Sequence, residues 1–257
     1  KGFWHAHIGW IIENKDSKIQ GVNDLQNNKI LVWQHKHYFK IAIFVSFILP
    51  MIISAFYGRP FGGLLWGGFL RVTLVHHFTF FINSLCHYVG KRPFDPNSTA
   101  RDSWWVAYFT FGEGFHNYHH KFQWDYRNGI AWYAFDPGKW TIKFLSWFGL
   151  TKDIRKVSEY NILLAKLESM KTSIQEQYSN MPEKLKENYQ DKINSFQECA
   201  IKIVQSWKEL EKEISQLKKS NIKDKFQLAI LNQKRKLYRK EFAAVMNSIT
   251  ILMLSLK

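Results

Sequence analysis

The stretch Gly112–His120 has the sequence GEGFHNYHH. Its histidines, His116, His119 and His120, are spaced i, i+3 and i+4, so on a helix they share one face over an arc of roughly 100°. In a strand, His119 would point away from the other two. Clustered neutral imidazoles suit iron, zinc or copper better than magnesium or calcium. The spacing predicts a helix with a metal-binding face, and a surface histidine run without a metal stays open as the alternative.

The composition divides this chain of 257 residues, with net charge +15, into two kinds of sequence. Two uncharged or nearly uncharged runs lie between Ile41 and Cys86, whereas the last hundred residues are rich in Lys, Glu and Gln. This division predicts a membrane part followed by a soluble helical part. Cys86 and Cys199 lie in different segments without a CxxC spacing. Neither a disulfide framework nor a thiolate metal site is therefore expected.

Two transmembrane helices are predicted from the apolar runs. Ile41–Tyr57 is a run of 17 uncharged residues with Pro50 as its only breaker. The glycine-rich stretch 58–63 is typical of a tight turn. A second span follows from about Leu64 to Cys86, interrupted by Arg71, His76 and His77.

The positive charges predict the topology of these spans. Six Lys or Arg residues precede the first span, the turn carries one, and the stretch from His87 to Val157 carries ten. The positive-inside bias therefore places both flanks in the cytoplasm and makes the two spans a hairpin. The excess of positive charge fits a cytoplasmic face against anionic lipid. Nucleic-acid binding is the rival interpretation, but no recognition motif accompanies the charge, so we expect no nucleic-acid partner.

Polar residues form a stripe on the second predicted span. His76, Phe80, Asn83 and His87 follow each other at steps of four, three and four, which places them on one helix face. Asn83 and His87 lie at the cytoplasmic end, on the same side as the histidines of 116–120, and could serve one metal centre. His76 lies roughly 16 Å deeper, so we expect it to bond another span.

Two His-x-His pairs, His5 with His7 and His35 with His37, lie in the polar and aromatic N-terminal segment. Alternate residues diverge on a helix, so the pairs alone do not make a metal site. We expect structural roles for these four histidines.

Helix signals continue after the second span. Thr99 and Asp102 have capping-box spacing, which predicts a helix that opens there and continues through Trp104 towards the histidines. Trp140–Phe148 is predicted to be a short amphipathic helix after a turn.

Beyond Ser158 a helix is predicted over Ser158–Tyr178, ending near Pro182, and after it the apolar residues recur at steps of four and three. The repeat runs from Tyr189 to Leu217 and resumes from Leu228 to Leu252, with Arg235 as its only polar member. This repeat predicts an antiparallel helical hairpin or coiled coil, whose role is packing or assembly.

The predicted fold class is an all-α integral membrane protein. It comprises one transmembrane hairpin, a cytosolic helical cap and an antiparallel coiled-coil-like C-terminal tail. The predicted segments are a cytosolic segment (1–39), the hairpin (40–87), the cap with the histidine cluster (88–157) and the helical extension (158–257).

Three motifs, in order along the chain, resemble a known family. They are Asn83–His87 (NSLCH), Arg92–Asp95 (RPFD) and Gly112–His120. They resemble the C-terminal half of membrane fatty-acyl desaturases, most closely the bacterial delta-9 acyl desaturases related to stearoyl-CoA desaturase. Phe3–Trp10 resembles the stretch that follows the family's second histidine box, and the resemblance covers about residues 1–157.

This resemblance implies a site with two iron ions held by nine histidines and a water-linked asparagine. His116, His119 and His120 match the family's third histidine box, His87 matches a further ligand, and Asn83 matches the water-mediated one. The first two boxes are absent from this sequence. We therefore expect the fragment to lie downstream of them and to be inactive by itself.

The resemblance further implies insertion of a cis double bond, expected at delta-9, with dioxygen and two electrons from a donor such as ferredoxin or a cytochrome. Phe80 is a candidate for lining the acyl tunnel, with ordinary helix packing as the alternative. Where acyl-CoA members carry a basic pair, this sequence offers only Lys15, so acyl-CoA and acyl-lipid substrates both stay open. The alternatives to a desaturase are a histidine-rich membrane lipid hydroxylase and a non-catalytic, membrane-anchored scaffold with a coiled-coil partner.

Overall fold

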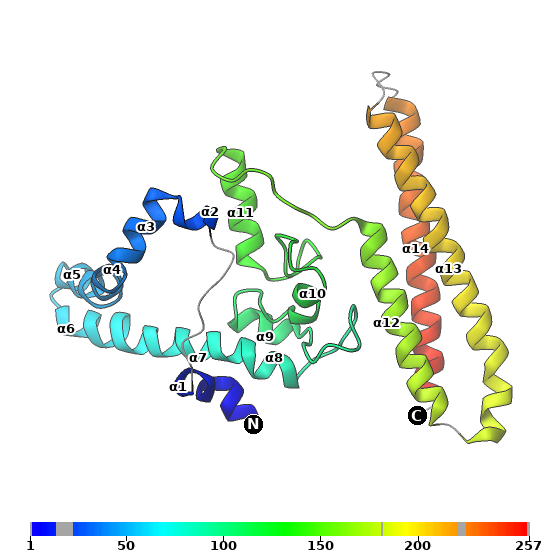
Figure 1. Ribbon diagram of the computed structural model, residues 1–257, viewed down its shortest axis with the longest axis horizontal. Coiled ribbons are helices and arrows are strands. Elements are labelled where there is room, and N and C mark those ends of the chain that lie inside the picture. Colours follow the sequence, from blue (N-terminus) through cyan, green and yellow to red (C-terminus); the bar gives the residue numbers. More distant parts are fainter. Residues whose placement is uncertain (1, 14–22, 181, 220–224, 256–257) are drawn as a thin grey trace. The chain divides into compact units, whose positions relative to one another are not determined.

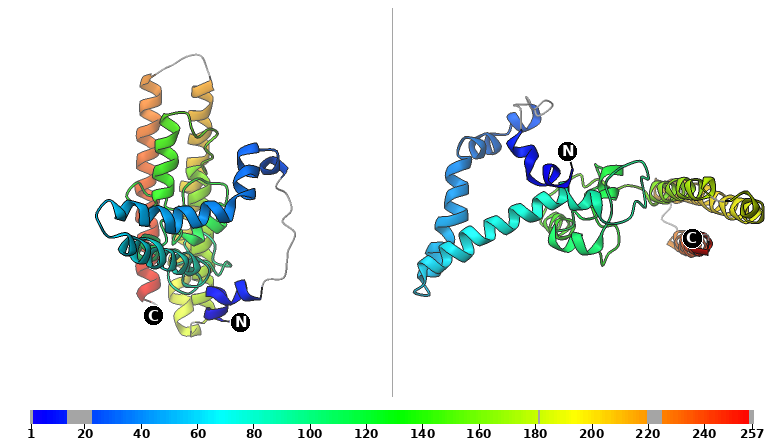
Figure 2. Two further views of the ribbon diagram at one scale, coloured as in Figure 1. Left: turned by 90° about the vertical axis from the view of Figure 1, so that its left-hand side faces the viewer. Right: turned by 90° about the horizontal axis from the view of Figure 1, so that it is seen from below.

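The computed structural model describes residues 2–13, 23–180, 182–219 and 225–255 (Figures 1 and 2). These residues form helices and two isolated β-bridges, and no strand occurs among them. The predicted all-α fold class is therefore confirmed. The chain separates into two compact units, one of Lys1–Tyr88 with Tyr108–Thr110 and one of Val89–Ala107 with Phe111–Lys257.

The described residues of the first unit form helices, three of which are π-helical stretches. They are η1 (His5–Gly9), α1 (Trp10–Ile12), α2 (Asn23–Gln26), α3 (Lys29–Lys36), α4 (Tyr38–Ile43), η2 (Phe44–Ile48), α5 (Leu49–Ala55), α6 (Pro60–Gly62), η3 (Gly63–Leu70), α7 (Arg71–Asn83) and α8 (Leu85–Tyr88).

One helical stretch of this unit could cross a membrane by length and composition. It is Tyr38–Ala55, whose 18 residues run through α4, η2 and α5 and are not buried. Among the described residues no other helix meets the same criteria. The second predicted span is helical, as η3 and α7, but it contains Arg71 and two histidines. The transmembrane hairpin therefore stays a prediction.

The stretch Tyr38–Ala55 and the stretch formed by η3 and α7 approach each other closely at Gly63 and are linked by Arg71. A Cβ on Gly63 would clash with the Ser54 hydroxyl and the Pro50 carbonyl, so only glycine fits this contact. Arg71 donates to the carbonyls of Gly67 at 2.7 Å and Ser46 at 3.2 Å. Its guanidinium thus ties the two stretches together through backbone acceptors.

The described part of the second unit contains the short helix with the histidines, the 11-residue helix α11 and three long helices. Its helices are α10 (His116–Lys121), α11 (Pro137–Trp147), α12 (Glu159–Ser179), α13 (Glu183–Lys219) and α14 (Lys225–Ser255), and α9 (Trp104–Phe109) joins the two units. The start of α11 differs from the predicted Trp140. Asp136 caps it by accepting a hydrogen bond from Lys139 N at 2.9 Å, and Pro137 occupies the first helical position.

The long helices pack side by side through the apolar repeat (Figure 1). Trp207 of α13 is fully buried, in a cluster with Phe242 of α14. Leu163 and Leu167 of α12 join the same cluster. The packing therefore involves three helices, whereas the sequence repeat predicted a pair.

Helix α12 also packs against the histidine helix. Its Ile162 and Ala165 share a buried cluster with Tyr118 of α10, together with Phe94 and Phe122. The predicted extension thus begins with a helix whose side chains complete the hydrophobic core beneath α10.

Candidate metal centre

The histidines of α10 gather their imidazoles on one turn, as the spacing predicts. The Nε2 atoms of His116 and His120 lie 3.0 Å apart. The rings of His116 and His119 stack with centroids 6.1 Å apart. His116 is buried, His119 is half-buried and His120 is exposed, so the cluster runs from the interior to the surface.

The imidazole of His120 is held in its neutral form. Partial desolvation of the ring lowers its pKa from the ordinary value, and the neighbouring His119 lowers it further, against a smaller opposing effect of Asp95. A neutral imidazole keeps a lone pair for a metal ion, whereas an imidazolium has none.

The turn before α10 requires glycine at two positions. Gly112 has φ +104°, a conformation that side chains disfavour, and a Cβ there would press against Asp136. A Cβ on Gly114 would clash with the backbone of Ala107. These two contacts hold the start of α10 close to α9 and to the loop before α11.

Asp102 caps α10 from a distant position in the sequence. Its Oδ1 accepts hydrogen bonds from the backbone N of Asn117 at 2.7 Å and of Tyr118 at 3.1 Å. Burial raises the pKa of Asp102 to about 6, although these backbone donors oppose the shift. The prediction that Thr99 and Asp102 open a helix at their own position is wrong, because isolated bridges to Lys91 and Phe115 carry Asp102 to α10 and α9 begins only at Trp104.

Asn117 makes four hydrogen bonds with its side chain and is fully buried. Its Oδ1 accepts from Phe94 N at 2.8 Å and Asp95 N at 3.1 Å, and its Nδ2 donates to Asp95 O at 2.8 Å and Ala100 O at 3.0 Å. Asn117 was not among the predicted site residues. The signal was available, since Asn117 and Tyr118 lie on the face of the helix opposite the histidines.

Tyr118 anchors the same face of α10 to a buried ion pair. Its hydroxyl donates to Asp125 Oδ2 at 2.7 Å, and Arg127 binds Asp125 through Nε at 2.9 Å and Nη2 at 2.7 Å. Burial alone would raise the pKa of Asp125, but the bonds from Arg127 and Tyr118 outweigh it and lower the pKa. The amide of Val157 also donates to Asp125, at 2.8 Å.

The first unit holds the other predicted site residues. Helix α7 ends at Asn83, which is exposed, and His87 lies half-buried in α8. Ser84 separates the two helices with φ −107° and ψ −71°. The continuous stripe expected from His76 to His87 is therefore interrupted after Asn83.

Phe80 is half-buried and surrounded by histidine rings in this unit. Its ring meets that of His7 edge-on at 5.5 Å and stacks on that of His76 at 5.9 Å. These contacts are helix packing, and its tunnel-lining role stays a prediction. Lys15 lies outside the described residues.

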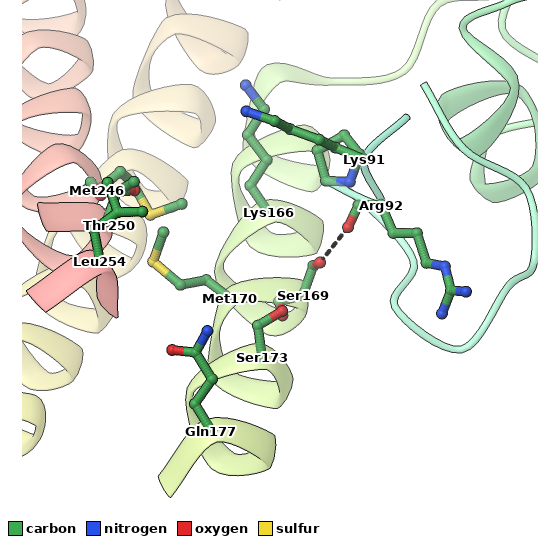
Figure 3. A pocket seen from close by; sticks show the side chains of 11 residues that line it. Lys91, Arg92, Lys166, Ser169, Met170, Ser173, Gln177, Met246, Thr250 and Leu254 are labelled. Carbon is green, nitrogen blue, oxygen red and sulfur yellow. Dashed lines mark hydrogen bonds between the residues drawn. The ribbon is translucent and has the colours of Figure 1, made fainter. Parts of the chain in front are cut away.

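A pocket of about 460 Å³ lies in the second unit (Figure 3). It is lined by residues 91–93, by α12 and by α14, with Met170 and Met246 on its walls. Ser169 Oγ donates to the Arg92 carbonyl at 2.6 Å across one side. None of the predicted site residues lines this pocket.

Comparison with known proteins identifies the family. A family model described as "Fatty acid desaturase" matches residues 1–143, more than half of the chain. The chain belongs to the fatty acid desaturase family. The desaturase match contains α7, α8 and α10 with all their histidines, and it ends before α12.

Individual desaturases are similar over the same part of the chain. Acyl-CoA desaturase 1 of Saccharomyces cerevisiae is 40% identical over 163 residues, which are 62% of this chain and 32% of that protein. The sn-1 stearoyl-lipid 9-desaturase of Synechocystis is 40% identical over 158 residues, 60% of this chain and 48% of that protein. Delta-9 acyl-lipid desaturase 1 of Arabidopsis thaliana is 33% identical over 164 residues, 62% and 52% respectively. The chain thus spans about a third to a half of the length of these relatives.

Proposed function

We propose that this chain is part of a di-iron fatty-acyl desaturase, which inserts a cis double bond into a saturated acyl chain with dioxygen and two electrons. The observation that carries the proposal is the 3.0 Å approach of His116 Nε2 and His120 Nε2 on the helix that resembles the family's third histidine box. Delta-9 is the proposed position, because relatives named for delta-9 or 9-desaturation match the chain.

The imidazoles of α10 fit a metal ion by their geometry. Two nitrogens that are adjacent ligands of one ion, each at about 2.0–2.1 Å from it, lie roughly 3 Å apart. The separation of the His116 and His120 nitrogens has this value without any rearrangement of the helix. The neutral state of His120 supports the same role.

We propose His87, His116, His119 and His120 as direct ligands of iron, with Asn83 acting through a water molecule. Two iron ions need more ligands than these residues offer. The further imidazoles would come from a part of the protein outside this chain, since the match covers only 32% and 48% of two of its relatives.

The bound iron would supply the oxidising power that removes hydrogen from an unactivated methylene group. The residues of this chain would hold the ligands. Asp102, Asn117 and Tyr118 fix α10 from the face opposite the histidines, so the imidazoles keep their mutual distances. Phe80 is the proposed wall of the acyl tunnel.

The proposed membrane arrangement follows the predicted topology. Tyr38–Ala55 and the following helix would form a hairpin in the bilayer, with the histidines on the cytoplasmic face. The helices beyond Ser158 would form an antiparallel coiled-coil-like tail on that side, where a coiled-coil partner could bind. Ferredoxin or a cytochrome is the proposed class of electron donor.

The acyl carrier is proposed as coenzyme A or a lipid. Relatives named for acyl-CoA and for lipid substrates both match the chain, and Lys15 alone does not decide between them.

Purification of the full-length protein with its iron, followed by analysis of its acyl products, tests the proposal. Bound iron and a new double bond are the expected results. A hydroxylated acyl chain would favour the lipid hydroxylase, and a protein without iron would favour the scaffold.

A further inference from the structure

His7 is a buried histidine outside the proposed ligand set. It is 3% exposed, although it lies on the short η1 helix near the N-terminus. Its ring stacks on that of Phe3 at 5.9 Å and packs against that of Phe81 at 4.9 Å. This burial in an aromatic cage demands that both ring nitrogens find partners.

Both ring nitrogens of His7 lie within hydrogen-bond distance of a side chain: one of Ser84, which directly follows α7, and the other of His77 in α7. Nδ1 lies 3.0 Å from Ser84 Oγ, and Nε2 lies 3.1 Å from Nδ1 of His77. The Ser84 hydroxyl is also 3.0 Å from the carbonyl of Phe80, one helical turn back.

These three distances select one arrangement of protons. A serine hydroxyl has a single hydrogen, and the Phe80 carbonyl can only accept, so Ser84 donates to Phe80. Ser84 must then accept from His7, which carries its proton on Nδ1. Nε2 of His7 is left as an acceptor, and His77 donates to it through its own Nδ1–H. If His7 carried its proton on Nε2 instead, Ser84 would have to donate to His7 Nδ1. The Ser84 hydroxyl oxygen and the Phe80 carbonyl oxygen would then face each other at 3.0 Å without a proton between them.

The charge state of His7 agrees with this arrangement. Burial lowers its pKa, and His77 lowers it further, against a smaller effect of the Phe80 carbonyl. A neutral ring with one proton is what the chain of bonds from His77 through His7 and Ser84 to Phe80 requires.

This chain of bonds ends at the break between α7 and α8. A serine that bonds back to the carbonyl four residues earlier bends a helix. Here the bend falls between Asn83 and His87, the two proposed site residues of the first unit.

We propose that His7, as its Nδ1–H tautomer, is a positioning residue that fixes the break at Ser84 and thereby the direction of His87 relative to Asn83. The effect of this positioning on iron binding rests on the proposed function, whereas the assignment of the His7 and His77 tautomers does not.

Nitrogen NMR of this chain, labelled in its histidine rings and reconstituted in lipid bilayers, tests the proton arrangement directly. The signals of His7 and His77 are assigned by their loss in His7→Asn and His77→Asn. We expect the His7 ring to be neutral and protonated at Nδ1, and the His77 ring to carry a proton on its own Nδ1. A His7 ring protonated at Nε2, or doubly protonated at neutral pH, would overturn the proposal.

Iron affinity of the full-length protein tests the positioning role. His7→Phe keeps an aromatic ring but neither nitrogen, and we expect its iron affinity to fall by about tenfold or more. His7→Asn keeps a donor near the place of Nδ1 and should recover most of that loss. His5→Phe is the matched control, since His5 lies on the same turn and pairs with the exposed Glu13 at 3.1 Å.

Wild-type iron affinity in His7→Phe, with helix content unchanged, would overturn the positioning role. An equal loss in His7→Asn and His7→Phe would do so too, because the donor would then not matter. A wild-type protein without iron would instead reject the proposed function, and the NMR result would still decide the tautomers.

Discussion

His116 and His120 face each other through their Nε2 atoms, 3.0 Å apart, on one turn of α10. Without a metal, this contact requires that one imidazole ring donates to the other. With a metal, the same two nitrogens are spaced as adjacent ligands of one ion.

Replacement of either histidine should remove bound metal. We expect His116→Ala or His120→Ala in the full-length protein to abolish turnover and to lower its iron content, because one imidazole ligand is lost. Membrane insertion should be unchanged. His35→Ala, at an exposed position of α3, is the control and should retain iron and activity. Substantial activity in either α10 variant would remove that residue from the ligand set.

Iron retention should fall as the pH is lowered. The pKa of His120 lies below its ordinary value of 6.5, because burial and His119 disfavour the imidazolium. The ring is therefore neutral at pH 7 and binds metal without competition from protons. We expect iron to stay bound from pH 8 to 6.5 and to be released as the pH falls further, measured as iron content after dialysis. Release that begins above pH 7 would contradict this charge state.

The side chain of Asn117 should stabilise the loop between α8 and α9. Asn117→Ala leaves the backbone groups of Phe94, Asp95 and Ala100 without their partners in a buried site. We expect a loss of about 2–5 kcal/mol in the free energy of unfolding, measured by denaturant titration in detergent. Asn97→Ala, in the exposed part of the same loop, should cost less than about 0.5 kcal/mol. Equal costs for the two variants would contradict the hydrogen-bond assignment.

Helix α12 should matter for the histidines although it lies outside the matched family region. Ile162 and Ile214 are both 6% exposed, but Ile162 shares a buried cluster with Tyr118, whereas the described members of the Ile214 cluster belong to α13 and α14. Ile162→Asp places a charge beneath α10, so we expect it to lower iron retention of the full-length protein. Ile214→Asp should disturb the long helices and leave iron bound. If Ile162→Asp retained as much iron as Ile214→Asp or more, α12 would not support the site.

The sequence predicted the parts of the site that depend on local spacing. The i, i+3, i+4 pattern of His116, His119 and His120 was sufficient to place three imidazoles on one turn, because helical geometry is fixed by the backbone. Short-range patterns could not predict Asp102 as the cap of α10, since its partners lie fifteen or more residues away. The break at Ser84 was missed for the same reason, because its partner His7 is 77 residues distant.

The apolar repeat beyond Ser158 shows a similar limit. It identified residues that α13 and α14 bury, such as Trp207 and Phe242. It did not predict that α12 completes the core under Tyr118, because that contact depends on how separate helices pack.

The central claim is that His87 and the histidines of α10 bind the same iron centre. Anomalous scattering at the iron edge from crystals of the full-length protein measures this most directly. The account predicts anomalous peaks within coordination distance of His87, His116, His119 and His120. Anomalous peaks beside the α10 histidines with the His87 ring pointing away from them would contradict the claim of a shared iron centre. The absence of any peak near α10 would also contradict it.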